Sequence, residues 1–263
     1  MPDVMSSQPA PEADIRWRVC CAPAETTPLT AAESARLRRF VEQRSQAWGR
    51  RICEFLGLSG PYEVSVVVRP GSDMSVTRDR HVEVGATAET VSAALAHELV
   101  HALAGPSASP VFREGLAVFV DSRLRLAGDV WPFYDLTPHR WTQMFVEDAT
   151  FEPLATLLAR RRIEPTPEEG ISLATRLYLE AGSLVGFLVD DNGLDAFWPM
   201  YRSATLPAGF DAEPLQRVWL RQLGGAVTAD EWRRREAAAA RLVDDGRHGF
   251  SPAGAGRPRS EDR

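Results

Sequence analysis

The sequence predicts an α+β fold, because a few short strand patterns before residue 85 are followed by a long series of helical patterns. The clearest strand is residues 62–68, a valine-rich run that lies between two prolines. Apolar residues recur at helical spacing from Thr30 to Leu56, and again over much of the second half of the chain. The chain has 263 residues, 44% of them hydrophobic, which is enough to bury a substantial core.

Two shorter strand candidates follow, at residues 74–77 and 81–84, and the segment Arg78-Asp79-Arg80 turns one into the other. His81 lies next to this turn and is expected on the surface. Two helices are expected between residues 87 and 126. Further helices are expected at about residues 153–162, 171–191, 193–203, 212–223 and 228–243.

The most informative segment is His97–His101, which reads H-E-x-x-H inside a helical pattern. Thr87 is a good N-cap for this helix, and Gly105 marks its end. Side chains four residues apart lie on one face of a helix, so the two histidines can reach one metal ion while Glu98 addresses a water on that metal. Zinc peptidases use this arrangement. The alternative is a pair of hydrogen-bonded core histidines with a surface glutamate between them.

A catalytic zinc site needs a third protein ligand and one open position, and Glu114 is the best candidate for that ligand. Ser109 can cap a second helix and Pro110 suits its first position, so Glu114 lies early in that helix. A glycine and a proline between the two helices favour a sharp reversal, which can bring Glu114 against the histidines. Gly115 and Ala117 are small and allow close packing near the metal. The alternative is an exposed glutamate, favoured by the helix dipole.

H-E-x-x-H followed by E-G-x-A on the next helix resembles the gluzincin metallopeptidases, particularly the peptidase MA-like families, and is also similar to plant and bacterial basic secretory proteins. The resemblance implies that His97, His101 and Glu114 are zinc ligands and that Glu98 is the general base. The helix that begins near Tyr178 is similar to a downstream helix of these families, in several of which a tyrosine donates a hydrogen bond to the oxyanion. Tyr178 is therefore a catalytic candidate. The alternative is a core tyrosine whose hydroxyl is a polar tip.

The resemblance also implies a zincin-like layout, in which a small twisted sheet packs beside the H-E-x-x-H helix and a mainly helical lobe follows, with the cleft between them. The expected divisions are a disordered N-terminus (1–14), an N-terminal α+β lobe (15–127), a helical C-terminal lobe (128–245) and a disordered tail (246–263). By analogy with zinc peptidases, residues 80–85 are expected to form a sheet edge that pairs with extended substrate. Residues 128–141, rich in aromatics and proline, form either a wall of the cleft or a loop that packs on itself.

Composition limits the partners and the compartment. The net charge of -6 gives no broad attraction to nucleic acid or to an anionic membrane, so neither is expected as a partner. Cys20, Cys21 and Cys53 are not spaced as a disulfide framework or a zinc knuckle. We find no run of about 18 apolar residues and no classical signal segment, which predicts a cytoplasmic protein and leaves non-classical export open.

Together these features predict a zinc-dependent metallopeptidase that hydrolyses a peptide or protein substrate through a metal-activated water, with Glu98 as general base. Asp121, two turns after Glu114, is a candidate to orient a ligand histidine. A catalytically inactive binding or regulatory protein with a zincin fold is the first alternative. A metal-free helical interaction protein is the second, and the oligomeric state stays open.

Overall fold

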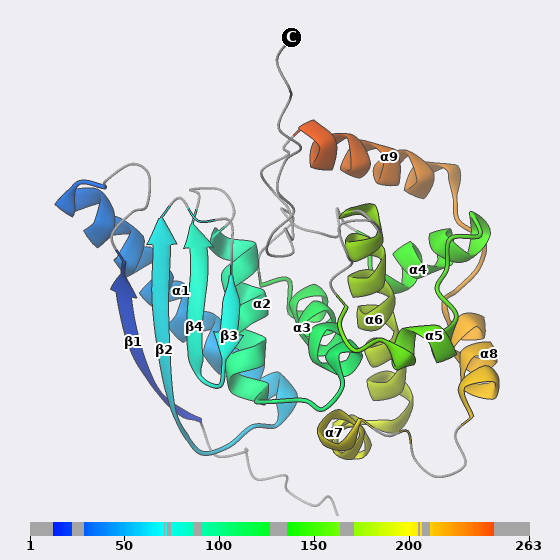
Figure 1. Ribbon diagram of the computed structural model, residues 1–263, viewed down its shortest axis with the longest axis horizontal. Coiled ribbons are helices and arrows are strands. Elements are labelled where there is room, and N and C mark those ends of the chain that lie inside the picture. The colour runs from blue at the N-terminus through cyan, green and yellow to red at the C-terminus, as the bar shows by residue number, and fades with distance from the viewer. Residues whose placement is uncertain are drawn as a thin grey trace, which may run out of the picture.

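Figure 1 shows the fold in a computed structural model, which describes residues 13–22, 29–70, 72, 75–86, 91–126, 136–163, 171–204, 206 and 211–244. A four-stranded sheet lies on one side of the molecule, and helices cover it and make up the other side (Figure 1). The strands are β1 (Asp14–Cys21), β2 (Pro61–Pro70), β3 (Val76–Arg78) and β4 (His81–Ala86), in the order β1-β2-β4-β3. The predicted α+β class is confirmed.

The sheet is mixed, because β1, β2 and β4 run parallel whereas β3 runs antiparallel to β4. Residues of β2 alternate between a buried and a more exposed face, and Tyr62, Val64, Val66 and Val68 lie on the buried one. This alternation is typical of a sheet that packs on one side. β1 is missing from the elements predicted from the sequence, although Ile15, Trp17 and Val19 alternate with arginines in the manner of a half-buried strand.

Two helices pack on the buried face of the sheet. α1 (Ala31–Leu56) begins after Thr30, whose hydroxyl accepts a hydrogen bond from the Glu33 N–H while the Glu33 carboxylate accepts one from the Thr30 N–H. It ends at Gly57, which has a left-handed φ of 64°. α2 (Val91–Ala104) contacts β3 and β4 on one side and α1 on another, which explains why its pattern is apolar almost all round.

The rest of the described chain is helical: α3 (Pro110–Leu124), α4 (Pro138–Glu147), α5 (Leu154–Ala159), α6 (Ile171–Asn192), α7 (Leu194–Ser203), α8 (Ala212–Gln222) and α9 (Ala229–Asp244). α3 packs along α6, and α6 also contacts α4, α7 and α8 (Figure 1). Glycine permits the close approach of α3 and α6, because Gly115 faces the carbonyl of Ala181 and Gly182 faces Val118. Since α2 contacts both the sheet and α3, it joins the two parts of the fold.

The expectation that residues 80–85 form the sheet edge is wrong. β4 lies between β2 and β3, and the three-residue strand β3 forms the edge instead. The physical reason is the tight turn at Asp79, which has a φ of 53° and folds β3 back antiparallel onto the outer side of β4. His81 is exposed, as predicted.

Helix α4 is not predicted from the sequence, because its first residues belong to the segment rich in aromatics and proline. Pro138 occupies the first turn of α4, and the Thr137 hydroxyl accepts a hydrogen bond from the Arg140 N–H. Residues 127–135, which carry most of the predicted cleft wall, lie outside the described residues, as do Thr87 and both terminal segments beyond residues 13 and 244. Among the helices that the structure describes, none is long and apolar enough to cross a membrane.

Candidate metal centre

Helix α2 presents two histidines on one face. His97 and His101 are four positions apart, and both are buried, with 5% and 4% of their surface exposed. The helix ends one turn later, at Ala104, because Gly105 adopts a φ of 78° and donates its N–H to the His101 carbonyl at 3.0 Å. The predicted end of this helix is therefore confirmed.

Helix α3 supplies the third side chain. The Ser109 hydroxyl accepts a hydrogen bond from the Phe112 N–H at 3.3 Å, and Pro110 is the first helical residue, as predicted. Glu114 then lies early in the helix and is buried, with 5% of its surface exposed, so the alternative of an exposed glutamate is wrong. The Tyr201 hydroxyl donates to the carbonyl of the glycine that ends α2, at 2.8 Å, and so ties the α2–α3 reversal to α7.

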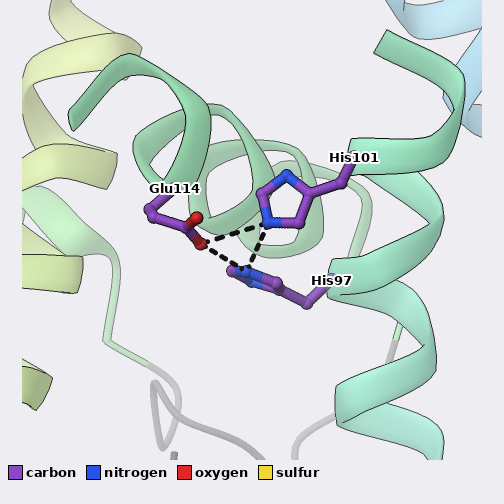
Figure 2. A group of neighbouring side chains, drawn as sticks. All are labelled: His97, His101 and Glu114. Carbon is purple, nitrogen blue, oxygen red and sulfur yellow. Dashed lines mark hydrogen bonds and ion pairs between the residues drawn. The ribbon is translucent and has the colours of Figure 1, made fainter. Parts of the chain in front are cut away.

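Figure 2 shows how the two helices bring these side chains together. The Nε2 atoms of His97 and His101 lie 3.0 Å apart, and Oε2 of Glu114 lies 2.9 Å from the first and 3.1 Å from the second. The three atoms thus form a nearly equilateral triangle. In the part of the chain that the structure describes, these residues are the buried group that could hold a metal ion.

Hydrogen bonds alone do not satisfy this triangle. Each imidazole Nε2 carries at most one proton and an ionised carboxylate oxygen carries none, so at most two of the three contacts contain a proton. The remaining contact brings two polar atoms together with no hydrogen bond between them. A cation bound by all three atoms removes this conflict, and two imidazoles with one carboxylate are a donor set that zinc accepts. Ligand atoms of a tetrahedral zinc site lie roughly 3.3 Å apart, close to the observed spacing.

The charges in this cluster compensate one another. Burial opposes an ionised carboxylate, but the charges and hydrogen bonds of His101 and His97 hold the pKa of Glu114 well below its ordinary value. Burial also opposes an imidazolium, but Glu114, with smaller contributions from Glu98 and Asp121, raises the pKa of His97. Glu114 is therefore an anion in the folded chain, which is the state in which a carboxylate binds a metal.

Two further predicted residues lie beside the cluster. Tyr178 of α6 is buried, and its ring stands edge-on to the His97 ring with the centroids 6.0 Å apart. Asp121 is buried on α3, where its charge contributes to the raised pKa of His97. The Nδ1 atom of His101 has no hydrogen-bond partner among the described residues, so Asp121 does not orient this histidine. The roles predicted for Tyr178 and Asp121 stay predictions.

Glu98 is buried as well, so the alternative of a surface glutamate is wrong, and it contacts Thr77, for which the sequence predicts no role in the site. The Thr77 hydroxyl of β3 donates a hydrogen bond to Oε2 of Glu98 at 2.6 Å. Arg113 donates one to the main-chain carbonyl of Thr77 at 3.3 Å, and another of its nitrogens lies 3.3 Å from Oε1 of Glu114. The sequence gives one indication of this contact. Thr77 is a polar residue at the strand position that pairs with Val82, and the side chain of Val82 faces the core.

Comparison with known proteins assigns no relative to this chain. No protein-family model matches it, and neither a curated protein nor a solved structure matches it. The support for a zincin-like site is therefore the buried group of His97, His101 and Glu114 itself, arranged as H-x-x-x-H on one helix and a glutamate on the next.

Proposed function

We propose that this chain is a zinc-dependent peptide hydrolase. The observation that carries the proposal is the buried triangle of His97 Nε2, His101 Nε2 and Glu114 Oε2, with sides of 2.9, 3.0 and 3.1 Å. Three protein ligands leave one position of a tetrahedral zinc site open, which distinguishes catalytic from structural zinc sites. The buried carboxylate of Glu98 directly follows the first histidine, where H-E-x-x-H peptidases carry their general base.

Each side chain then has a defined task in the hydrolysis of a peptide or protein substrate. When bound, zinc lowers the pKa of a water molecule and polarises the scissile carbonyl. The Glu98 carboxylate accepts a proton from the attacking water and passes it to the leaving amine. The Tyr178 hydroxyl donates a hydrogen bond to the oxygen on which negative charge develops. Asp121 holds His97 in the orientation in which its Nε2 faces the other two ligand atoms.

Metal content tests the ligand set. Protein purified without added metal is expected to contain about one zinc per chain by elemental analysis. His97→Ala is expected to contain almost none, whereas His81→Ala, which changes an exposed histidine outside the cluster, retains it. Folding of each variant is checked by circular dichroism. If the wild-type protein and His97→Ala are both folded and both lack zinc even after incubation with it, the proposal is wrong.

Cleavage of a peptide library by the zinc-loaded protein tests the chemistry. Glu98→Gln is expected to keep its zinc and to lose at least about 100-fold in turnover, because the amide cannot accept the proton. Glu63→Gln, which changes an exposed glutamate on the outer face of the sheet, is the matched control and retains activity. Turnover that survives in Glu98→Gln refutes its role as base. Stoichiometric zinc without any cleavage favours the alternative of an inactive zincin-fold binding protein.

A further inference from the structure

Strand β3 reaches the candidate metal centre through Thr77. This residue lies on the edge strand, with its side chain on the buried face of the sheet and 8% of its surface exposed. Its hydroxyl oxygen lies 2.6 Å from Oε2 of Glu98 and 3.1 Å from the main-chain oxygen of Glu98. A hydroxyl has a single proton, and the shorter distance to a charged oxygen assigns that proton to the carboxylate.

This hydrogen bond fixes one end of the Glu98 side chain and leaves the other end available. Within the described part of the chain, no second residue donates a hydrogen bond to the Glu98 carboxylate. Oε2 of Glu98 therefore accepts the hydrogen bond from Thr77, and Oε1 is the oxygen that can accept a proton from the attacking water. Without the hydrogen bond from Thr77 the buried Glu98 carboxylate would lose this donor, which is costly.

Arg113 contacts the main chain of Thr77, whereas Glu98 contacts its side chain. Arg78 and His81 flank a two-residue turn and form a hydrogen-bonded pair of the hairpin. Thr77, one position before Arg78, therefore forms a non-hydrogen-bonded pair with Val82, and its main-chain groups point away from β4. The Thr77 carbonyl is thus directed outward, where it accepts the hydrogen bond from Arg113. The same guanidinium engages Oε1 of Glu114, which leaves Oε2 of that carboxylate to face the two histidines.

We propose that Thr77 is the positioning residue for Glu98 and that Arg113 is the positioning residue for Glu114. The proposal rests on the proposed function, because the orientation of Glu98 matters for its role as base. Thr77 holds the base through Oε2 in the orientation needed for proton transfer through Oε1. Arg113 holds the ligand carboxylate through its second oxygen and clamps the edge strand to α3. The short strand β3 is therefore part of the site as well as part of the sheet.

Substitutions at Thr77 separate the hydrogen bond from packing. Thr77→Val keeps the shape and removes the hydroxyl, whereas Thr77→Ser keeps the hydroxyl and removes a methyl group. In peptide cleavage, Thr77→Val is expected to lower kcat about 10- to 100-fold with KM and zinc content nearly unchanged, and Thr77→Ser to retain most of kcat. Wild-type kcat in Thr77→Val, or equal losses in both variants, overturns the proposal. Thr77→Ala gives the same comparison where Thr77→Val does not fold.

Arg113 is tested by zinc affinity, measured in competition with a chelator. Arg113→Met keeps an apolar stem without the guanidinium, and it is expected to weaken zinc binding about 10- to 100-fold, because Glu114 loses the group that orients it. Thr77→Val is expected to bind zinc like the wild-type protein. Unchanged affinity in Arg113→Met overturns the role of Arg113, and equal weakening in both variants indicates a general structural role and overturns the separate roles.

Crystal structures of the zinc-loaded proteins give a readout that is independent of turnover. In the wild-type protein the Glu98 carboxylate is expected in one rotamer on Thr77, and in Thr77→Val it is expected to be displaced or spread over several rotamers. The same single rotamer in both structures overturns the proposal. If the zinc-bound wild-type protein cleaves no peptide, the hydrolase function fails, while this comparison and the zinc affinities still decide whether Thr77 and Arg113 position the two carboxylates.

Discussion

Gly115→Ala is the substitution for which the structure gives the most direct expectation. A Cβ at this position of α3 would lie 2.4 Å from the carbonyl oxygen and 2.8 Å from the carbonyl carbon of Ala181, on α6. Ordinary contacts between carbon and a carbonyl oxygen are about 3.3 Å or longer. The overlap is therefore about 1 Å, and it involves a helix backbone that cannot rotate away.

Two opposing contributions determine the size of the effect. Overpacking a tightly packed interface costs about 1–3 kcal/mol, and an overlap with backbone belongs at the upper end of this range. Alanine is favoured over glycine inside a helix by about 1 kcal/mol. The expected net loss is therefore about 2 kcal/mol in the free energy of unfolding, or roughly 5 °C in Tm for a chain of this size. Because Gly115 directly follows Glu114, the displacement of α3 is also expected to weaken zinc binding.

Urea unfolding of the metal-free proteins measures the first effect, and chelator competition measures the second. Gly186→Ala is the matched control on α6, because the nearest atoms to its Cβ would belong to side chains, the Phe119 ring at 3.0 Å and His139 at 3.3 Å. It is expected to change stability by less than about 1 kcal/mol and to leave zinc binding intact. If Gly115→Ala is as stable as the wild-type protein, or no worse than Gly186→Ala, the close packing of α3 on α6 does not limit this site.

Three further predictions concern other parts of the molecule. Burial raises the pKa of Glu180 to about 8, although the hydrogen bond from the Glu152 N–H and the charge of Arg176 act to lower it. The folded chain therefore keeps a proton on Glu180 that the unfolded chain releases near pH 4.5. The stability that this bound proton contributes is complete below pH 4.5 and is lost as the pH rises to about 8. In urea unfolding of the metal-free proteins, the free energy of unfolding of Glu180→Gln should therefore rise relative to that of the wild-type protein between about pH 5.5 and about pH 8.5. If the two free energies depend on pH in parallel, this prediction is wrong. Arg140→Met should lower the free energy of unfolding, measured by thermal unfolding, by about 2 kcal/mol, because this guanidinium donates hydrogen bonds to Glu231 and to the loop before α9. Arg217→Met, at an exposed ion pair, is the control and should lower it by almost nothing. Tyr178→Phe should lower kcat about 100-fold with zinc retained, and unchanged kcat would identify a core tyrosine.

The parts of the site that depend on local sequence are predictable. The four-residue spacing of His97 and His101 places both on one face of α2 whatever the rest of the chain does, because it follows from helix geometry. Ser109 and Pro110 similarly fix where α3 begins, and so place Glu114 early in it. In the same way the caps of α1 and the alternation in β2 are determined by residues that are close in the sequence.

The parts that depend on distant pairing are not predictable in this way. The Thr77 hydroxyl meets Glu98 across 21 positions, and Arg113 meets the Thr77 carbonyl across 36, so both contacts follow from the register of the β3–β4 hairpin and its docking on α2. The position of β4 inside the sheet also depends on how that hairpin folds back. The apolar residues of β1, Ile15, Trp17 and Val19, are only partly buried, and the place of β1 at the edge of the sheet is set by parallel pairing with β2. Single-sequence periodicity does not encode these contacts.

The short reversal between α2 and α3 has a consequence for the order of folding. His97 and Glu114 are 17 positions apart, whereas the ion pair of Arg123 with Asp190, which joins α3 to α6, spans 67. Closing the shorter loop costs about 1 kcal/mol less in chain entropy. We therefore expect the helical hairpin that carries His97, His101 and Glu114 to form before α6 docks. If the cluster binds zinc as proposed, zinc present during refolding is expected to accelerate the assembly around that hairpin, in addition to stabilising the final fold.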